Sequence, residues 1–197
     1  LVFDTAMIGI QEIEIESEEE AALQEDEDEA EDDHEREYEF EGPYQVDLLA
    51  GTRLSDLAEV EPGIYTELEA EIAPVLENNH SVYIGGSYTN EASETFPVIF
   101  HTSEEIDFEV ESDQGIEVND QQIKDLIVRI NLQGLFSTID LDAAQRNSSG
   151  EIIISKESNS QMAEKLLSYL ESVSEMEEDD DHDEDDDDDD NDDKDDK

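Results

Sequence analysis

Two acidic runs bound the part of this chain that can fold. The first covers residues 16–41, and the second closes the chain over residues 177–197. Runs this rich in carboxylates repel themselves and lack the apolar side chains whose burial would offset the entropy of ordering them. We therefore expect a disordered insert at residues 16–37 and a disordered tail at 177–197. Residues 1–176 are predicted to form a single domain around that insert.

The charge of the chain restricts its partners. Asp and Glu total 62 against 9 Lys and Arg, which gives a formal net charge of -53. A chain of this sign has no basic footprint for nucleic acid, and it is repelled by anionic lipid. The expected partners are divalent cations, basic proteins or basic surfaces. Adaptation to high salt is disfavoured, because it would spread the acids over the whole surface rather than gather them into runs.

Between the acidic runs, short segments alternate apolar and polar residues with the period of two that is typical of strands. Ile106, Phe108 and Val110, for example, alternate with Asp107 and Glu109. No strand and helix alternation accompanies them, which argues against a doubly wound α/β fold. The pattern predicts an all-β fold, an antiparallel two-sheet β-sandwich of seven to nine strands. The predicted strands cover residues 2–15, 38–48, 64–72, 82–84, 95–101, 106–110, 126–132 and 152–154.

The first predicted strand changes phase part-way along. Ile8 and Ile10 share one face, whereas Ile13 and Ile15 share the other. A β-bulge near Gln11 would bring both pairs to one face, because it adds one residue to a strand without ending it.

Turn residues divide the other segments. Gly42-Pro43 predicts a kink or bulge, and Pro62-Gly63 suits the centre of a type II turn. Asn78-Asn79 is expected at a hairpin tip, and Gly85-Gly86 at a bulge. In the strand at 64–72, the alternate residues starting from Ile64 are predicted to share one face.

One helix is predicted, over residues 160–175. Asn159 or Ser160 can cap it. Its apolar residues recur at helical spacing, so the helix should pack on the sheet. These residues are Met162, Leu166, Leu170 and Val173.

No catalytic motif is present. The chain has no Gly-x-Ser-x-Gly, no P-loop and no His-Glu-x-x-His sequence. It contains no Cys, so disulfides, Cys-based zinc sites and thiol nucleophiles are excluded. The four histidines, His34, His80, His101 and His182, are expected to be surface residues. We therefore expect no enzymatic activity.

Two groups of aspartates are candidate calcium ligands. Asp140, Asp142 and Glu151 match positions 1, 3 and 12 of an EF-hand loop, but Ala144 and Gln145 replace a ligand and the turn glycine. A looser calcium site at Asp140 and Asp142 remains, with turn capping as the alternative. The tail offers weak, multi-site calcium binding, because oxygen-only ligands suit a hard cation. Its candidate ligands are Asp185, Asp186, Asp187, Asp188, Asp189 and Asp190.

Several strings resemble a known family. Three strings carry the resemblance, and they occur along the chain in this order: Ile8-Gly-Ile-Gln-Glu-Ile-Glu-Ile-Glu, Tyr38-Glu-Phe-Glu-Gly-Pro-Tyr-Gln-Val-Asp-Leu-Leu and Glu61-Pro-Gly-Ile-Tyr-Thr-Glu-Leu-Glu. They are similar to a family of uncharacterised secreted surface lipoproteins of the Bacteroidota type, with a β-sandwich domain and an acidic insert. The resemblance implies an exported bacterial cell-surface or secreted protein without catalytic residues. It also implies a lipid anchor upstream of Leu1, and we expect the chain to be a processed product because it starts at Leu rather than Met.

A second likeness is by composition alone. Eukaryotic histone chaperones join β-rich domains to Asp/Glu tracts that bind basic proteins, and some calcium-storage proteins end in Asp runs. No run of 18 apolar residues exists that could span a membrane.

From the resemblance and the acidic runs, we predict a non-enzymatic, extracytoplasmic protein with a structural, adhesive or cation-binding role. The alternative is an acidic, histone-chaperone-like protein that binds basic proteins.

Overall fold

The computed structural model describes residues 1–17, 36–51, 60–61, 63–118 and 130–172, and within them the chain is mostly β. The strands are β1 (Val2–Ser17), β2 (Arg36–Asp47), β3 (Gly63–Ile72), β4 (Val82–Thr89), β5 (Thr95–Thr102), β6 (Ile106–Val118) and β7 (Ile152–Ile154). The helices are α1 (Leu132–Ser137) and α2 (Ser160–Ser172), with 3-10 turns η2 (Glu77–Asn79) and η3 (Leu141–Ala143).

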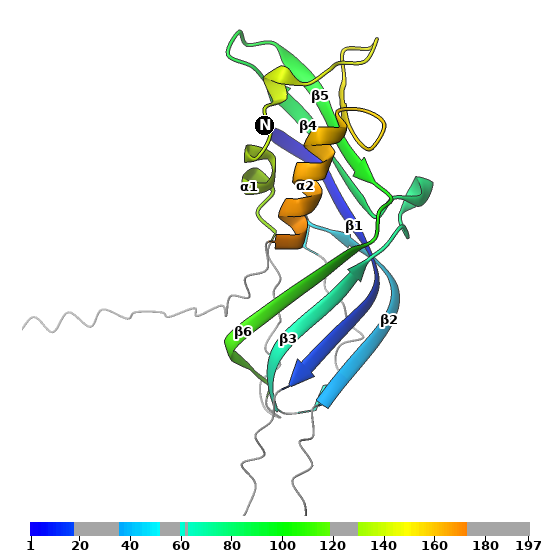
Figure 1. Ribbon diagram of the computed structural model, residues 1–197, viewed down its shortest axis with the longest axis vertical. Helices are drawn as coiled ribbons and strands as arrows, with labels where there is room; N and C mark the ends of the chain where they lie inside the picture. Colours follow the sequence, from blue (N-terminus) through cyan, green and yellow to red (C-terminus); the bar gives the residue numbers. More distant parts are fainter. Residues whose placement is uncertain (18–35, 52–59, 62, 119–129, 173–197) are drawn as a thin grey trace, which may run out of the picture.

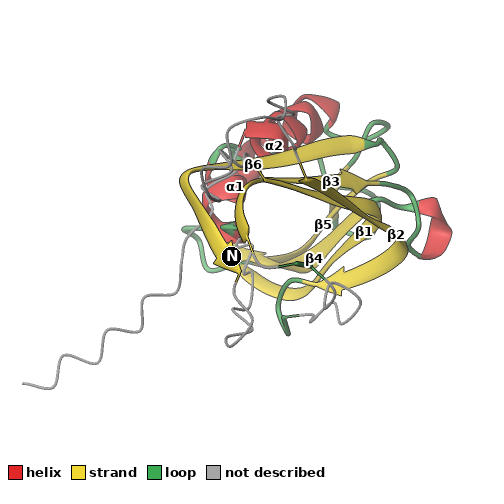
Figure 2. Ribbon diagram, turned by 90° about the horizontal axis from the view of Figure 1, so that it is seen from below, coloured by secondary structure: helices red, strands yellow, loops and turns green. Residues whose placement is uncertain are grey.

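The seven strands form one curled sheet rather than the two sheets of the predicted sandwich. Their order is β6-β3-β1-β4-β5-β7, and β2 pairs with β1 off this path. All pairs are antiparallel except β5 and β7, which are parallel. Seen end-on, the strands curl into a half-barrel, with α2 beside β6 (Figure 2).

The two-sheet prediction is wrong because one strand belongs to both halves of the sheet. β1 has 16 residues. Residues 7–17 of β1 pair with β2, while residues 10–16 pair with β3 and residues 2–8 pair with β4. Since the β2 pairing overlaps both of the others, β3 and β4 lie one after the other along the opposite edge of β1. Figure 1 shows the result: β6, β3 and β2 beside the end of β1, and β4 and β5 beside its start.

Gly9 marks the point of β1 where β3 gives way to β4. Its carbonyl accepts a hydrogen bond from the amide of Ala73 at 2.9 Å, and its own amide donates to the carbonyl of Ser81 at 2.8 Å. A Cβ at this position would lie 2.5 Å from Cγ2 of Val75 and 2.8 Å from the carbonyl oxygen of Ala73. A side chain is therefore excluded where the two halves of the sheet meet.

The segment with Asn78 and Asn79 is not a hairpin tip. β3 and β4 pair with β1 and not with each other, and the chain between them forms η2. Both asparagines have a φ of 60°, which Asn tolerates better than most residues. The asparagines form the predicted turn, but the strands on either side of it do not pair with each other as a hairpin requires.

The predicted bulge at Gln11 is confirmed. The register of β1 shifts between Ile10 and Glu12 against both β2 and β3. As a result, the four isoleucines of the two phases are all buried in one core. These are Ile8, Ile10, Ile13 and Ile15. The cis peptide bond of Gly42-Pro43 lies opposite this bulge, at the predicted kink of β2.

Two other register predictions fail. The pairing of β3 with β6 shifts between Tyr65 and Glu67, so Tyr65 is buried and Ile64 is exposed, contrary to the single face predicted for 64–72. β4 pairs with β5 without interruption through Gly85 and Gly86. The irregularity there lies in β1 instead, between Phe3 and Thr5.

The predicted C-terminal helix is confirmed as α2, within which Ala163, Leu166 and Leu170 are buried. Val173, the last residue of the predicted stripe, lies outside the described residues. Helix α1 begins where the strand predicted over residues 126–132 ends, and the pattern of the sequence does not predict it. Residues 126–129 are not described, and Leu132 begins α1 because the side chain of Asn131 accepts a hydrogen bond from the amide of Gly134 at 2.8 Å.

The ends of the first acidic run belong to strands. β1 continues to Ser17 and β2 begins at Arg36, so the predicted insert at 16–37 is too long by two residues at each end. These residues add rungs to the β1 and β2 ladder. Residues 18–35 and the tail at 177–197 lie outside the described residues. Within the described part of the chain, none of the helices has the length and apolar character needed to cross a membrane.

Candidate cation-binding face

Four neighbouring strands carry an acidic residue at every second position. The order acid, other, acid, other, acid occurs in residues 12–16 of β1, 37–41 of β2, 67–71 of β3 and 107–111 of β6. Because side chains alternate between the two faces of a sheet, the acids of one strand share a face. The residues between them, such as Ile13, Leu68 and Phe108, point the other way and are buried in the core.

The register brings the acids of the four strands into rows. β2, β1, β3 and β6 are adjacent in that order, and acids pair with acids across every boundary. From β2 to β6 the rows are Glu41–Glu12–Glu71–Asp107, Glu39–Glu14–Glu69–Glu109 and Glu37–Glu16–Glu67. In the third row, the backbone of Glu67 pairs with that of Glu111. We call the eleven residues of the three rows, without Glu111, the acidic face.

The acidic face is a regular array. Neighbouring strands are about 4.8 Å apart, and alternate residues of one strand about 6.7 Å apart. Strands β1, β3 and β6 contain no Lys or Arg, and β2 contains only Arg36 at its start. The positive side chains of Arg146, Lys156 and Lys165 belong to the segment from 130 to 172, and Lys156 pairs with Glu104 at 2.9 Å.

Two triads within the acidic face converge most closely. Glu14, Glu16 and Glu37 form one, across β1 and β2, and the other joins Glu67 and Glu69 of β3 to Glu109 of β6. In each triad, one carboxylate oxygen from every residue lies within 4.8 Å of the others. Among the described residues, these are the two groups of three or more His, Asp or Glu side chains that meet this condition.

Repulsion and partial burial disfavour the charged forms of these carboxylates. Desolvation, followed by the charges of Glu16, Glu109 and Glu69, raises the pKa of Glu67 to about 7. Desolvation and a hydrogen bond with Glu12 raise the pKa of Glu14. The pKa of Glu39 is also raised, mainly by the charge of Glu12. Part of the acidic face therefore holds protons near neutral pH.

The predicted calcium ligands Asp140 and Asp142 do not converge in this way. The Asp140 carboxylate accepts a hydrogen bond from the amide of Asp142 at 3.1 Å and so caps η3, which is the turn-capping alternative. Asp142 accepts a hydrogen bond from the hydroxyl of Tyr88, which raises the pKa of that phenol. Glu151 is bonded instead to Nδ2 of Asn147 at 2.7 Å. The tail aspartates 185–190 lie outside the described residues.

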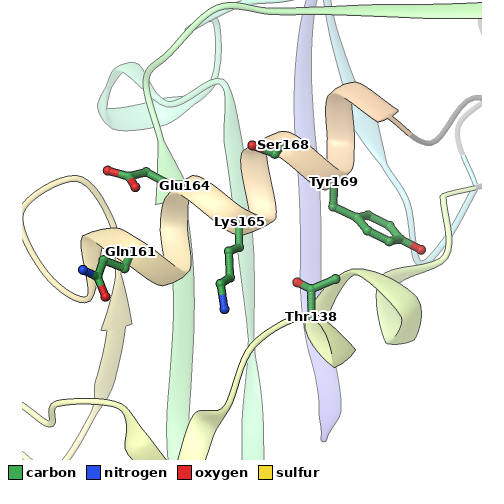
Figure 3. Close-up of a pocket in the computed structure, with 6 residues that line it drawn as sticks. All are labelled: Thr138, Gln161, Glu164, Lys165, Ser168 and Tyr169. Carbon is green, nitrogen blue, oxygen red and sulfur yellow. The ribbon is translucent and has the colours of Figure 1, made fainter.

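A separate hollow of about 630 Å³ lies along α2. It is lined by Thr138, Gln161, Glu164, Lys165, Ser168 and Tyr169. Figure 3 shows Lys165 extending from α2 toward the loop of Thr138, while Glu164 points away from it. Tyr169 packs on α1, where its hydroxyl would be 2.6 Å from a Cβ at Gly134. The hollow follows from the packing of two helices and does not gather an acid and a base around one point.

Comparison of the chain with protein-family models, with curated proteins and with solved structures found no match. The site therefore has to be interpreted from its own chemistry. Sequence reasoning missed the acidic face, although the signal was present in the four runs of alternating acids. What the runs could not supply was the pairing that places them side by side.

Proposed function

We propose that this is a non-enzymatic, extracytoplasmic protein whose acidic face binds divalent cations, calcium above all. The observation that carries the proposal is the pair of triads with carboxylate oxygens within 4.8 Å of one another. Two oxygens bound to one Ca²⁺ at about 2.3–2.6 Å can be at most about 5 Å apart. Each triad therefore suits a single calcium ion without movement of the strands.

Charge neutralisation supplies the driving force. The acidic face holds eleven acids on four strands, and the raised pKa values of Glu14, Glu39 and Glu67 report the cost of charging them together. A calcium ion between three carboxylates removes this repulsion and displaces the protons that partly relieved it. Binding should therefore stabilise the fold and tighten as the pH rises through about 7, where Glu67 ionises.

The expected affinity fits the extracytoplasmic location that we propose. Within the described part of the chain, the triads lie on one face of the sheet, and no loop there adds the further ligands that high-affinity sites have. Their affinity should therefore be in the millimolar class of extracellular modules, which is useful only where calcium is itself millimolar. This agrees with the resemblance to secreted surface lipoproteins, for which an anchor upstream of Leu1 would hold the face at the cell surface.

Calorimetry and melting curves with Ca²⁺ test the proposal in a chain that lacks residues 177–197, so that the tail does not contribute. One variant carries E14Q, E37Q, E69Q and E109Q, which breaks both triads. The matched control carries E77Q, E91Q, E105Q and E164Q, four exposed acids outside the acidic face. Calcium should raise the melting temperature of the parent and the control, and the triad variant should lose most of that increase.

Equal calcium responses of the triad variant and the control would show that the acidic face is not the site. The same instrument tests the chaperone alternative with a lysine-rich basic protein at low and physiological salt. Submicromolar binding of that protein in physiological salt, with no calcium heat beyond ionic-strength controls, would replace the proposed function by the binding of basic proteins.

A further inference from the structure

Two histidines lie side by side on the other half of the sheet. His80 immediately precedes Ser81 and β4, and His101 belongs to β5, directly opposite Tyr83 of β4. The rings of His80 and His101 have centroids 4.6 Å apart, with planes inclined by 41°. The ring of Tyr83 stacks on His80 at 6.0 Å. Strand pairing therefore holds two imidazoles against each other.

The Nδ1 atom of His80 is buried and has no hydrogen-bond partner among the described residues. A buried polar atom without a partner is energetically unfavourable, so such atoms usually have a bound ion or water as a partner. Both side chains are only half-buried, so a small ion can reach them from solvent.

A carboxylate lies next to the pair. Phe100 pairs with Ile154 of β7, and the chain then turns through residues 155–158 beside His101. Glu157 in this turn acts electrostatically on His101, and one of its oxygens accepts a hydrogen bond from the hydroxyl of Ser155 at 3.1 Å. Glu157 therefore adds a negative charge near the pair, which favours a bound cation.

We propose that His80 and His101 bind a first-row transition metal ion such as Zn²⁺ or Cu²⁺, with water completing the coordination and Glu157 supplying a nearby negative charge. Neutral imidazole nitrogen is a preferred ligand of these ions, whereas calcium and magnesium prefer oxygen. Metal–nitrogen bonds of about 2.0–2.1 Å at neighbouring positions place two imidazole centroids roughly 4.5–5.2 Å apart, the shorter value at a right angle and the longer at the tetrahedral angle. The observed spacing fits this range, and the net charge of the chain draws cations toward it.

An NMR titration of the full chain with Zn²⁺ tests this site, in excess Ca²⁺ that saturates the carboxylates. The histidine ring protons are well suited as probes, because the chain has only four histidines. One equivalent of Zn²⁺ should shift the ring signals of His80 and His101 and leave those of His34 and His182 unchanged. H80Q and H101Q should each weaken Zn²⁺ binding at least tenfold, whereas H34Q and H182Q should not change it.

Zn²⁺ that shifts all four histidines alike, or none of them, would overturn the proposal. The titration of the unmodified chain gives this result even if a variant fails to fold. Undiminished one-to-one Zn²⁺ binding by a folded H80Q/H101Q double variant would overturn it equally. The histidine site lies on the β4–β5 half of the sheet, away from the acidic face. The triad variant should therefore lose calcium binding but keep the Zn²⁺ shifts of His80 and His101.

Discussion

Glu16 of β1 and Glu67 of β3 pair directly across the sheet. Partial burial and the facing charge of Glu16 together raise the pKa of Glu67 to about 7, from an ordinary value of 4.5. A carboxyl whose pKa is higher in the folded than in the unfolded chain favours folding while it is protonated. Its contribution to stability is present in full below about pH 4.5 and is lost as the pH rises through about 7.

The first prediction is that E67Q makes the protein more stable than the parent chain at pH 8 in the absence of divalent cations. The full pKa shift corresponds to about 3 kcal/mol, and solvent screening of a partly exposed group should reduce the gain to about 1 kcal/mol. The advantage of E67Q should shrink toward pH 5. Urea denaturation of both chains at the two pH values measures it.

E91Q is the control for this experiment. Glu91 is exposed in the turn between β4 and β5, away from the acidic face, and its substitution removes the same unit of charge. An equal gain in E91Q and E67Q at pH 8 would attribute the effect to net charge and not to the pairing of Glu67 with its neighbours.

The second prediction concerns Gly9, where β1 changes partners from β3 to β4. G9A should destabilise the protein by about 1–3 kcal/mol, since the new methyl group would overlap Val75 and the carbonyl of Ala73. G85A is the matched control: Gly85 is also a buried strand glycine, but a Cβ there meets no atom closer than 3.7 Å. Urea denaturation should show a clear loss for G9A and a change within about 1 kcal/mol for G85A. Equal stabilities of the two variants would refute the close approach at Gly9.

Local features of this fold could be predicted from the sequence. The bulge at Gln11 follows from the change of phase between Ile10 and Ile13, and α2 follows from the spacing of its apolar residues. Each of these two signals comes from residues that lie only a few positions apart in the sequence. The physical cause, burial of one set of side chains against a core, acts on the local sequence whatever the partner strand is.

The sheet order and the acidic face could not be predicted in the same way. Which strands pair depends on contacts between distant parts of the chain, and nothing in residues 2–17 states that two strands share one edge of β1. Composition also hides the ends of β1 and β2. A strand with an acid at every second position is nearly as rich in charge as a disordered segment. Composition alone therefore assigns Glu37 to the insert, although it belongs to β2.

The third prediction tests the bulge directly. Deletion of Gln11 should leave a chain that folds, because without the extra residue a regular strand carries Ile8, Ile10, Ile13 and Ile15 on one face. Deletion of Glu14 should prevent stable folding, because it makes Ile13 and Ile15 neighbours and places them on opposite faces. Far-UV circular dichroism and thermal melting compare the two deletion variants with the parent chain. Equal loss of cooperative melting in both variants would show that Gln11 is not the extra residue that sets the register.

The fourth prediction concerns the protonation of His101 in metal-free solution. Desolvation first, and the neighbouring His80 second, lower the pKa of His101, while Glu157 acts in the opposite direction. H80Q should therefore raise the pKa of His101, and E157Q should lower it further, as measured by NMR titration of its ring protons with a chelator present. The lowered pKa favours the neutral ring in the folded chain. His101 therefore stabilises the fold at pH values above 6.5, the ordinary pKa of histidine, and this stabilisation is lost as the pH falls below 6.5 toward the lowered pKa. If H80Q left the titration of His101 unchanged, His80 would not contribute to the pKa of His101, and the close approach of the two rings would not hold in solution.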